Sequence, residues 1–333
     1  VVMSVHNGCC YLAEAIESIL VQTLKDFEFI IIDDGSTDGS TEVLKKYAGY
    51  DDRIRLIIQK NHGLPKALNI GLTVAHGKYI ARMDADDWAV PHRLQVQLAF
   101  MESNPEITVC GSAIEIYEYP NKHWNPPCAH HEIMARMLFE SCLYHPTVLY
   151  RKDDLLHYTQ GYSEEFTKAQ DYDLWQRLGR NSKVRFANLA EPLLRYRIHP
   201  EEGRSSYKWV QHKLADQVRK NYLLQLGIVP SKDEFKNHIV FCRSIENADV
   251  PDLDKCRQWL DCIEAANREK KVFSIASLRK ELESRWLNLC LQVANDRVTT
   301  AILYIKGNLI SRYSDGLYHA TRMFWRWTKA HLS

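Results

Sequence analysis

The chain has 333 residues, which is enough for one large domain or two ordinary ones. Its 43 Lys and Arg residues balance 42 Asp and Glu residues. No overall field therefore attracts nucleic acid, and we expect no nucleic-acid partner.

The nine cysteines indicate a cytoplasmic protein. Their number is odd and no Cys-x-x-Cys pair occurs, a pattern that predicts reduced, mostly buried thiols. No apolar run approaches the roughly 20 residues needed to cross a bilayer. The sequence starts at Val1 inside a predicted strand, so the lack of a signal peptide does not decide the cellular compartment.

The first two hundred residues alternate short apolar runs with helical patterns. Strands are predicted at residues 1–5, 27–32, 53–58 and 78–84, and helices at 10–22, around 43–44, and at 65–75. This alternation predicts an α/β fold with a doubly wound, mostly parallel sheet. Ligands bind such sheets at the carboxyl ends of the strands.

The pattern changes near Ser205, where the strand signals fade. From residue 207 onward the periodicity is helical, with breaks near Pro230 and Pro251. We therefore expect two parts, an α/β domain at 1–205 and a helical C-terminal domain at 206–333.

The first acidic cluster lies in IIIDDGSTDGS, residues 30–40. Gly35 and Gly39 allow a tight backbone, so the segment can be an ordinary strand-to-helix turn. Alternatively, a carboxylate of Asp33 or Asp34 accepts the imide hydrogen of a uracil ring. The loop lacks the glycine spacing of a dinucleotide fingerprint or a phosphate-binding P-loop.

The second acidic cluster, in YIARMDADDW, follows the strand predicted at 78–84. In an extended chain Asp84 and Asp86 point to one face while Ala85 and Asp87 point to the other. Two carboxylates on one face suit Mn²⁺ or Mg²⁺, which favour oxygen ligands. A solvated acidic loop is the alternative, but two acidic clusters at neighbouring strand ends favour the metal.

A third candidate group lies in LLRYRIHPEEGR. If residues 194–199 are extended, Arg195, Arg197 and His199 share one face and can meet a diphosphate, with Arg204 on the loop that follows. A solvated strand edge is the alternative. A zinc site is an alternative use of five Cys and His residues, but their spacing matches no common zinc site. Those residues are Cys128, His130, His131, Cys142 and His145.

Taken together, the motifs resemble an inverting family 2 glycosyltransferase of the GT-A fold, similar to bacterial enzymes that build lipooligosaccharide, O-antigen or capsule. The resemblance runs from Val1 to about Ser206 through IIIDDGSTDGS, NHGLPKALNIGL, YIARMDADDW, HPTVLYRKD and AQDYDLWQRLGR. It implies a UDP-sugar donor, Mn²⁺ or Mg²⁺, and a glycan or lipid-linked acceptor whose hydroxyl attacks in line.

The same resemblance assigns individual residues. Asp171 matches the family's catalytic base and Asp86 its metal ligand, while Gln170 stands where the family usually has Glu. His145 and Gln170 are candidates for the acceptor site, and Arg197, His199 and Arg204 for the leaving diphosphate. The residues expected to bind the donor are His6, Asn7, Asp33, Asp34, Asn61, Lys66, Arg82, Asp84 and Ala85.

The C-terminal tail, residues 303–333, sets five Lys and Arg residues against a single Asp and carries several aromatic side chains. This composition predicts binding to an anionic membrane surface on the inner face of the cell membrane. A helix packed on its own domain is the alternative. Two other functions stay open, a non-catalytic nucleotide-sugar-binding protein and a sugar nucleotidyltransferase.

Overall fold

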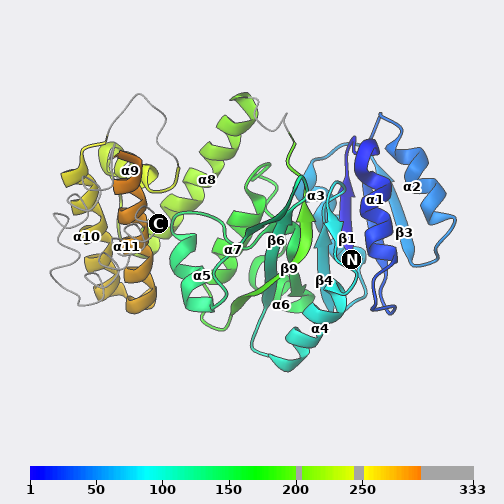
Figure 1. Cartoon of the computed structure of the whole chain (residues 1–333), viewed down its shortest axis with the longest axis horizontal. Coiled ribbons are helices and arrows are strands. Elements are labelled where there is room, and N and C mark those ends of the chain that lie inside the picture. The colour runs from blue at the N-terminus through cyan, green and yellow to red at the C-terminus, as the bar shows by residue number, and fades with distance from the viewer. Residues whose placement is uncertain (200–204, 244–250, 294–333) are drawn as a thin grey trace, which may run out of the picture. The chain divides into compact units, whose positions relative to one another are not determined.

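The structure, a computed structural model, describes residues 1–199, 205–243 and 251–293 (Figure 1). It divides into two compact units, Val1–Asn221 and Tyr222–Ser333. The domain boundary expected after residue 205 lies in the first turn of helix α8 (Ser205–Gln225). The division between the compact units falls inside that helix.

A mixed sheet forms the centre of the first unit. Its hydrogen-bonded order is β3-β2-β1-β4-β8-β6-β9-β5, with β7 paired to β6. The first four strands in this order are parallel to one another, and β8 runs antiparallel to both β4 and β6. The strands are β1 Val2–Val5, β2 Phe29–Asp34, β3 Ile54–Gln59, β4 Tyr79–Met83, β5 Trp88–Ala89, β6 Val109–Ile116, β7 Tyr119–Trp124, β8 Leu149–Arg151 and β9 Phe186–Tyr196.

From β1 to β4 a helix connects each strand to the next, which confirms the predicted alternation; β5 follows β4, and β7 follows β6, without a helix between them. The three helices expected at 10–22, near 43–44 and at 65–75 are α1, α2 and α3. The helices of this unit are α1 Cys9–Leu20, α2 Ser40–Ala48, α3 Leu64–Val74, α4 Arg93–Ser103, α5 His130–Met137, α6 Lys152–Thr159, α7 Gln170–Gly179 and most of α8, with a short 3-10 helix, η1, at His145–Thr147.

Alternate residues of the parallel strands face opposite layers of helices. Met3 and Ile31 belong to the apolar core that includes buried side chains of α1, α2 and α4. Val2 and Ile32 face α3, where Gly71 lets the helix come close. A Cβ atom on Gly71 would lie 2.5 Å from Cγ1 of Val2. Both faces of the sheet are therefore covered, as in a doubly wound fold.

The second unit is helical in the part that the structure describes, as predicted. After the end of α8 it contains α9 Lys232–Val240, α10 Leu253–Lys270 and α11 Ile275–Val293. Ser231 and Glu234 form a capping box at the start of α9, and Asp252 caps α10. Trp259 and Trp286 are buried in this unit. No helix within the described ranges has the length and apolar character required to cross a membrane.

Candidate active site

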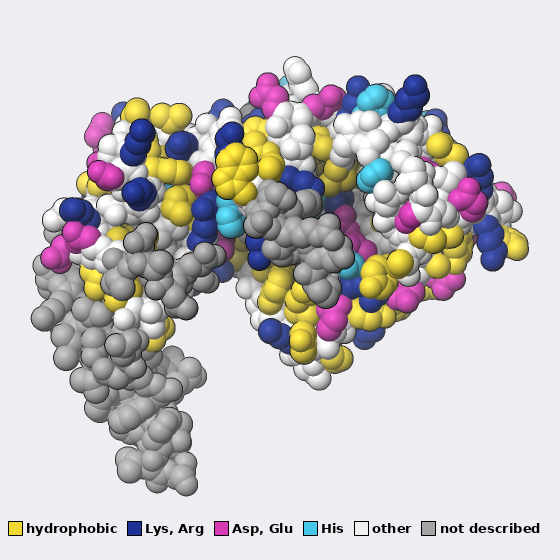
Figure 2. Space-filling view, turned by 90° about the horizontal axis from the view of Figure 1, so that it is seen from above, with side chains coloured by type: hydrophobic (Ala, Val, Ile, Leu, Met, Phe, Trp, Pro, Cys, Tyr) yellow, Lys and Arg dark blue, Asp and Glu magenta, His cyan; other side chains and the backbone are white. Residues whose placement is uncertain are grey.

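The carboxyl ends of the parallel strands gather the predicted site residues at one edge of the sheet. β1, β2 and β4 end at Val5, Asp34 and Met83, so the first acidic pair closes β2 and the second acidic cluster directly follows β4. Gly8, just after β1, lies beside Ala85, because a Cβ atom built on Gly8 would be 3.5 Å from that of Ala85. Figure 2 shows acidic and histidine side chains together in a hollow of the first unit.

The two aspartates at the end of β2 are buried, and Asp33 holds the loop after β2 while Asp34 holds the loop after β3. Asp33 accepts hydrogen bonds from the backbone N–H of Ser36, at 3.0 Å, and from the hydroxyl of Thr41. Asp34 accepts from Gln59 and from the backbone N–H groups of His62 and Gly63 at 2.7–2.9 Å. These bonds fix the loops after β2 and β3 and so form a rim at this edge of the sheet.

Polar side chains from three loops meet on that rim. The Nδ1 atom of His6 lies 3.0 Å from the backbone oxygen of Asp34, and Nδ2 of Asn61 lies 3.1 Å from the His6 ring. Asn7 has a left-handed backbone (φ 56°) and accepts a hydrogen bond from the backbone N–H of Thr37. His6, Asn7 and Asn61 are exposed, and Lys66 is half-buried in the first turn of α3.

Three carboxylates, one more than expected, come together after β4. Oxygens of Asp84, Asp86 and Asp87 lie within 4.8 Å of one another. The prediction that Asp87 would point away from the other two is wrong, because β4 ends at Met83 and the chain bends at residues 85–86. The alternation of an extended strand therefore does not apply there.

This carboxylate cluster suits a hard divalent cation. Burial, together with Asp84, raises the pKa of Asp86 and raises that of Asp87 well above its usual value. The Oδ2 atom of Asp87 is buried without a hydrogen-bond partner among the described residues. A set of crowded, partly desolvated oxygen ligands fits Mn²⁺ or Mg²⁺.

Arg197, the first residue after β9, forms hydrogen bonds with the loop that carries the carboxylate cluster. The backbone N–H of Arg197 donates to Oδ1 of Asp87 at 3.0 Å, and its Nε donates to the backbone oxygen of Asp86 at 3.0 Å. Its guanidinium carbon lies 4.0 Å from the ring centroids of both Tyr11 and Tyr117. This sandwich fixes the guanidinium beside the loop that carries the cluster.

His199 also contacts the cluster, since its Nε2 lies 2.8 Å from Oδ2 of Asp86. Arg195 is different: it pairs with Glu115 at 2.8 Å and stacks over the ring of Trp88. β9 ends at Tyr196, one residue before Arg197, so the predicted extended segment is only partly in the sheet. Arg204 lies outside the described residues.

A buried cation lies beneath the site. Arg82, on β4, is 3% exposed and forms an ion pair with Asp84. Burial acts to lower the pKa of Arg82, but the Asp84 carboxylate outweighs this effect and the pKa is raised. His145 is also buried, and its Nε2 lies 2.8 Å from the hydroxyl of Tyr162. Burial and the charge of Arg82 place the pKa of His145 well below its usual value, so the ring is neutral near pH 7.

Asp171 lies at the start of α7, close enough to Arg82 and Asp84 for their charges to affect it. Burial raises the pKa of Asp171, while the backbone N–H of Tyr172 and the Arg82 cation oppose that shift. The preceding Gln170 is 9% exposed and follows Ala169, whose backbone is left-handed (φ 56°). A non-glycine residue in this conformation turns the chain sharply into the helix.

The chain is similar to known proteins over most of its length. Residues 1–162 match the family described as glycosyl transferase family 2. The O-antigen biosynthesis glycosyltransferase WbnJ of Escherichia coli is 34% identical over 236 residues, which cover 66% of this chain and 89% of WbnJ. The chain belongs to glycosyltransferase family 2.

Solved structures share the fold of this family 2 chain. Staphylococcus aureus TarS 1-349 in complex with UDP has a TM-score of 0.55 at 17% identity, covering 87% of this chain and 89% of that chain. The mannosyltransferase PcManGT from Pyrobaculum calidifontis, in complex with GDP-Man and Mn²⁺, has a TM-score of 0.50 at 15% identity, with coverages of 96% and 82%. At such identities the likeness concerns the fold, and it confirms the predicted GT-A architecture.

The five Cys and His residues of the possible zinc site do not come together in this family 2 enzyme. Within the described ranges, the only group of three or more potential ligands drawn from His, Cys, Asp and Glu is the carboxylate cluster. His130 instead accepts a hydrogen bond from the backbone N–H of Phe186. Burial lowers the pKa of His130 to about 4.

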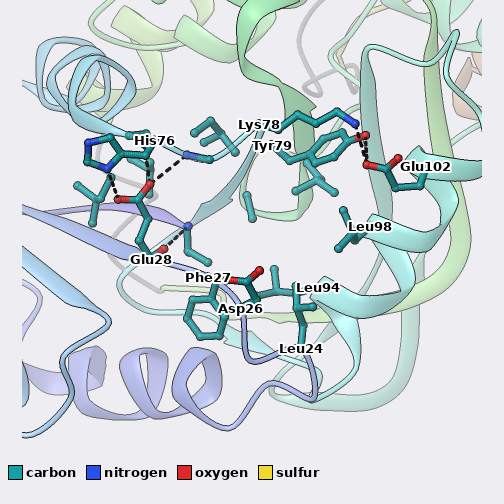
Figure 3. Close-up of a pocket in the computed structure, with 18 residues that line it drawn as sticks. Leu24, Asp26, Phe27, Glu28, His76, Lys78, Tyr79, Leu94, Leu98 and Glu102 are labelled. Atoms are coloured by element: carbon teal, nitrogen blue, oxygen red, sulfur yellow. Dashed lines mark hydrogen bonds and ion pairs between the residues drawn. The ribbon is translucent and has the colours of Figure 1, made fainter.

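A pocket of about 630 Å³ lies at the opposite edge of the sheet, near the amino ends of β1, β2 and β4 (Figure 3). Its charged side chains are largely paired: Glu28 with His76, and Glu102 with Lys78 at 2.9 Å. None of the site residues predicted from the sequence lines it. This pocket is therefore separate from the candidate active site of the glycosyltransferase.

Sequence reasoning missed several residues of the site. Asp87 could have been included from the adjacent acidic pair in DADD. Tyr11, Tyr117 and Tyr162 carry no such signal, because their contacts to Arg197 and His145 join segments far apart in the chain.

Proposed function

We propose that this family 2 glycosyltransferase moves an N-acetylhexosamine or a hexose, with inversion, from a UDP-sugar to a glycan or lipid-linked acceptor during cell-surface polysaccharide synthesis. The observation that carries the proposal is the carboxylate cluster of Asp84, Asp86 and Asp87. Asp171, at the start of α7, has a pKa raised by burial and lies close enough for the charge of Asp84 to raise it as well. The cluster can hold a cation beside the leaving diphosphate of the donor. Asp171 can take the proton of the acceptor hydroxyl that attacks the sugar.

On the donor side, Asp33, Asp34, His6, Asn7 and Asn61 form the rim for the nucleotide base and ribose. Names of similar proteins support this choice of donor, because TarS 1-349 is solved with UDP and with UDP-GlcNAc. The name of WbnJ, an O-antigen biosynthesis enzyme, supports a surface glycan as the product. Lys66, Arg82 and Ala85 complete the donor-binding set.

On the diphosphate side, Asp84, Asp86 and Asp87 would hold Mn²⁺ or Mg²⁺. The cation would supply charge neutralisation for the diphosphate. His199 and Arg204 remain our candidates for contacts with the leaving diphosphate. For Arg197, the contacts above support a positioning role, in which its guanidinium and backbone N–H hold the loop of Asp86 and Asp87.

On the acceptor side, Asp171 takes the proton of the attacking hydroxyl. Its raised pKa makes it a stronger base than an ordinary Asp, while the Arg82 cation helps to keep it ionised. His145 is buried and neutral, and its hydrogen bond with Tyr162 stabilises the residues beneath the acceptor side of the site.

The proposal is tested by a thermal-shift panel of nucleotide sugars with Mn²⁺ present. A ligand at 100 times its dissociation constant adds about 2.7 kcal/mol of apparent stability. UDP-sugars should raise the melting temperature more with Mn²⁺ than with EDTA, and ADP- or GDP-sugars should raise it less. If no UDP-sugar shifts the transition, the donor assignment is wrong.

The non-catalytic alternative is favoured by one residue, Gln170, in place of the usual Glu. Hydrolysis of a UDP-sugar by the wild-type enzyme would exclude it. Membership of family 2 speaks against the nucleotidyltransferase alternative, which would release pyrophosphate from UTP and a sugar phosphate.

We predict different outcomes for two changes at Gln170. An amide cannot take a proton at neutral pH but can donate and accept hydrogen bonds, so Gln170 should orient the acceptor or a nearby backbone group. Gln170→Glu should keep or raise activity, and Gln170→Ala should raise the acceptor KM with little change in the donor KM. Steady-state kinetics with both substrates varied would check this. An increase confined to the donor KM would indicate that Gln170 acts on the donor and not on the acceptor.

The basic, aromatic tail at 303–333 lies outside the described residues, and we propose that it binds an anionic membrane surface. Co-sedimentation with vesicles containing phosphatidylglycerol should recover the full chain but not a chain ending at Ser311. Equal recovery of the two chains, or no recovery of either, would contradict the proposal.

A further inference from the structure

Three aromatic side chains form a surface beside the candidate active site. The ring of Trp124, on β7, lies 6.3 Å from the ring of Tyr144 and 5.8 Å from that of Tyr196. The interplanar angles are 49° and 37°, so the rings are tilted rather than stacked in parallel. Tyr144 precedes η1 and Tyr196 ends β9, which means that three separate segments contribute to this surface.

The three rings differ in exposure. Tyr144 and Tyr196 are partly buried and pack against the core of the sheet. Trp124 is 40% exposed, and the strand that carries it is exposed along its whole length. The surface thus has a fixed base of two tyrosines and a large ring that water still reaches. Exposed aromatic rings held in this way are typical of binding sites.

Two of the three residues, Tyr144 and Tyr196, adjoin segments of the candidate active site in the chain. Tyr144 directly precedes His145, which bonds Tyr162 and lies near Arg82 beneath the site. Tyr196 directly precedes Arg197, which is bonded to the carboxylate cluster. Each tyrosine is therefore one residue, or about 3.8 Å along the backbone, from a segment that builds the active site.

We propose that Trp124, Tyr144 and Tyr196 bind a pyranose ring of the acceptor. This inference rests on the proposed function and adds an acceptor subsite to it. One face of a pyranose presents C–H groups, which pack against aromatic faces, while its hydroxyls keep their contacts with water at the rim. Burial, aided by Glu140, raises the pKa of Tyr144 to about 12, so its phenol stays protonated and can hydrogen-bond a sugar hydroxyl.

Trp124→Ala tests the proposal, and Tyr119→Ala is the matched control. Tyr119 is an aromatic residue of the same strand, 60% exposed, and belongs to a separate contact with Lys122. The probes are octyl β-D-glucopyranoside, octyl β-D-galactopyranoside and octyl N-acetyl-β-D-glucosaminide below their micellar concentrations, observed by saturation-transfer NMR. At least one probe should show saturated ring C–H protons with wild type and with Tyr119→Ala.

For that probe, Trp124→Ala should weaken binding by about tenfold or more, and Trp124→Phe should restore most of it because a smaller aromatic face remains. Binding of UDP with Mn²⁺ should be unchanged in all three variants, which would show that each variant keeps its fold. An unchanged signal in Trp124→Ala, or no saturation of any probe by the wild-type protein, overturns the proposal.

The same experiments separate failure of this inference from failure of the proposed function. Glycoside binding that needs Trp124, without UDP-sugar hydrolysis by wild type, would retain the sugar subsite and reject the transferase proposal. UDP-sugar hydrolysis with no Trp124-dependent glycoside binding would retain the transferase proposal and reject the sugar subsite.

Discussion

Asp171→Asn is expected to lower turnover by roughly 100-fold or more while leaving donor binding nearly intact. Loss of a general base typically costs this much, and Asn keeps the size of the side chain but cannot take a proton. Single-turnover kinetics with a UDP-sugar, beside UDP titrations in Mn²⁺, would measure both quantities. Glu164→Gln, a change at an exposed carboxylate before α7, is the control and should behave like wild type.

The pH dependence adds a second test of Asp171. Burial raises the pKa of this carboxyl, so the inactive, protonated form persists to a higher pH than it would for a free Asp. The wild-type rate should therefore fall on acidification through a pKa above the usual Asp value. The residual rate of Asp171→Asn should lack that acidic limb.

Near-normal turnover of Asp171→Asn would mean that the base lies elsewhere. Asp173 and Glu165 are then the next candidates. Asp173 is the weaker of the two on structural grounds, because its Oδ2 accepts a hydrogen bond from Nε of Arg177 at 2.8 Å and the residue is buried. Glu165 is exposed.

Asp86→Ala is expected to abolish transfer and to weaken UDP binding only when Mn²⁺ or Mg²⁺ is present. The reason is that the carboxylate would act on the nucleotide through the cation rather than directly. Calorimetric titrations of UDP in Mn²⁺ and in EDTA would measure the effect. Asp52→Ala, at an exposed carboxylate before β3, is the matched control and should bind UDP like wild type in both buffers.

Equal UDP affinity with and without cation in the wild-type protein would remove the basis for the metal assignment. A loss of UDP affinity in Asp86→Ala that is just as large in EDTA would point instead to direct contact between Asp86 and the nucleotide.

The order of strands and helices from β1 to β4 was predictable, as was the edge of the sheet at which the carboxyl ends of these strands meet. Apolar runs such as that of β2 and the helical spacing of α1 are local patterns that tertiary contacts do not override here. Parallel strands bring their carboxyl ends together, so the amino-acid sequence alone places the acidic clusters, at the end of β2 and after β4, at one edge of the sheet.

Details that depend on irregular backbone or distant segments could not be predicted. Asp87 joined the carboxylate cluster because the chain bends directly after β4, and no periodic pattern describes a bend. The guanidinium of Arg197 contacts Tyr11 and Tyr117, which come from α1 and the turn after β6. Trp124 likewise meets Tyr144 and Tyr196 only in the folded chain.

The stereochemistry of sugar release tests the central claim most directly. A panel of UDP-α-D-sugars, including UDP-GlcNAc, would be incubated with the enzyme and Mn²⁺ while ¹H NMR follows the anomeric protons before mutarotation. Attack by water on the face of the sugar opposite the diphosphate, with Asp171 as base, predicts that the first product is the β-anomer and that EDTA stops its release. Release of the α-anomer, or no UDP release from any sugar in the panel, would contradict the account.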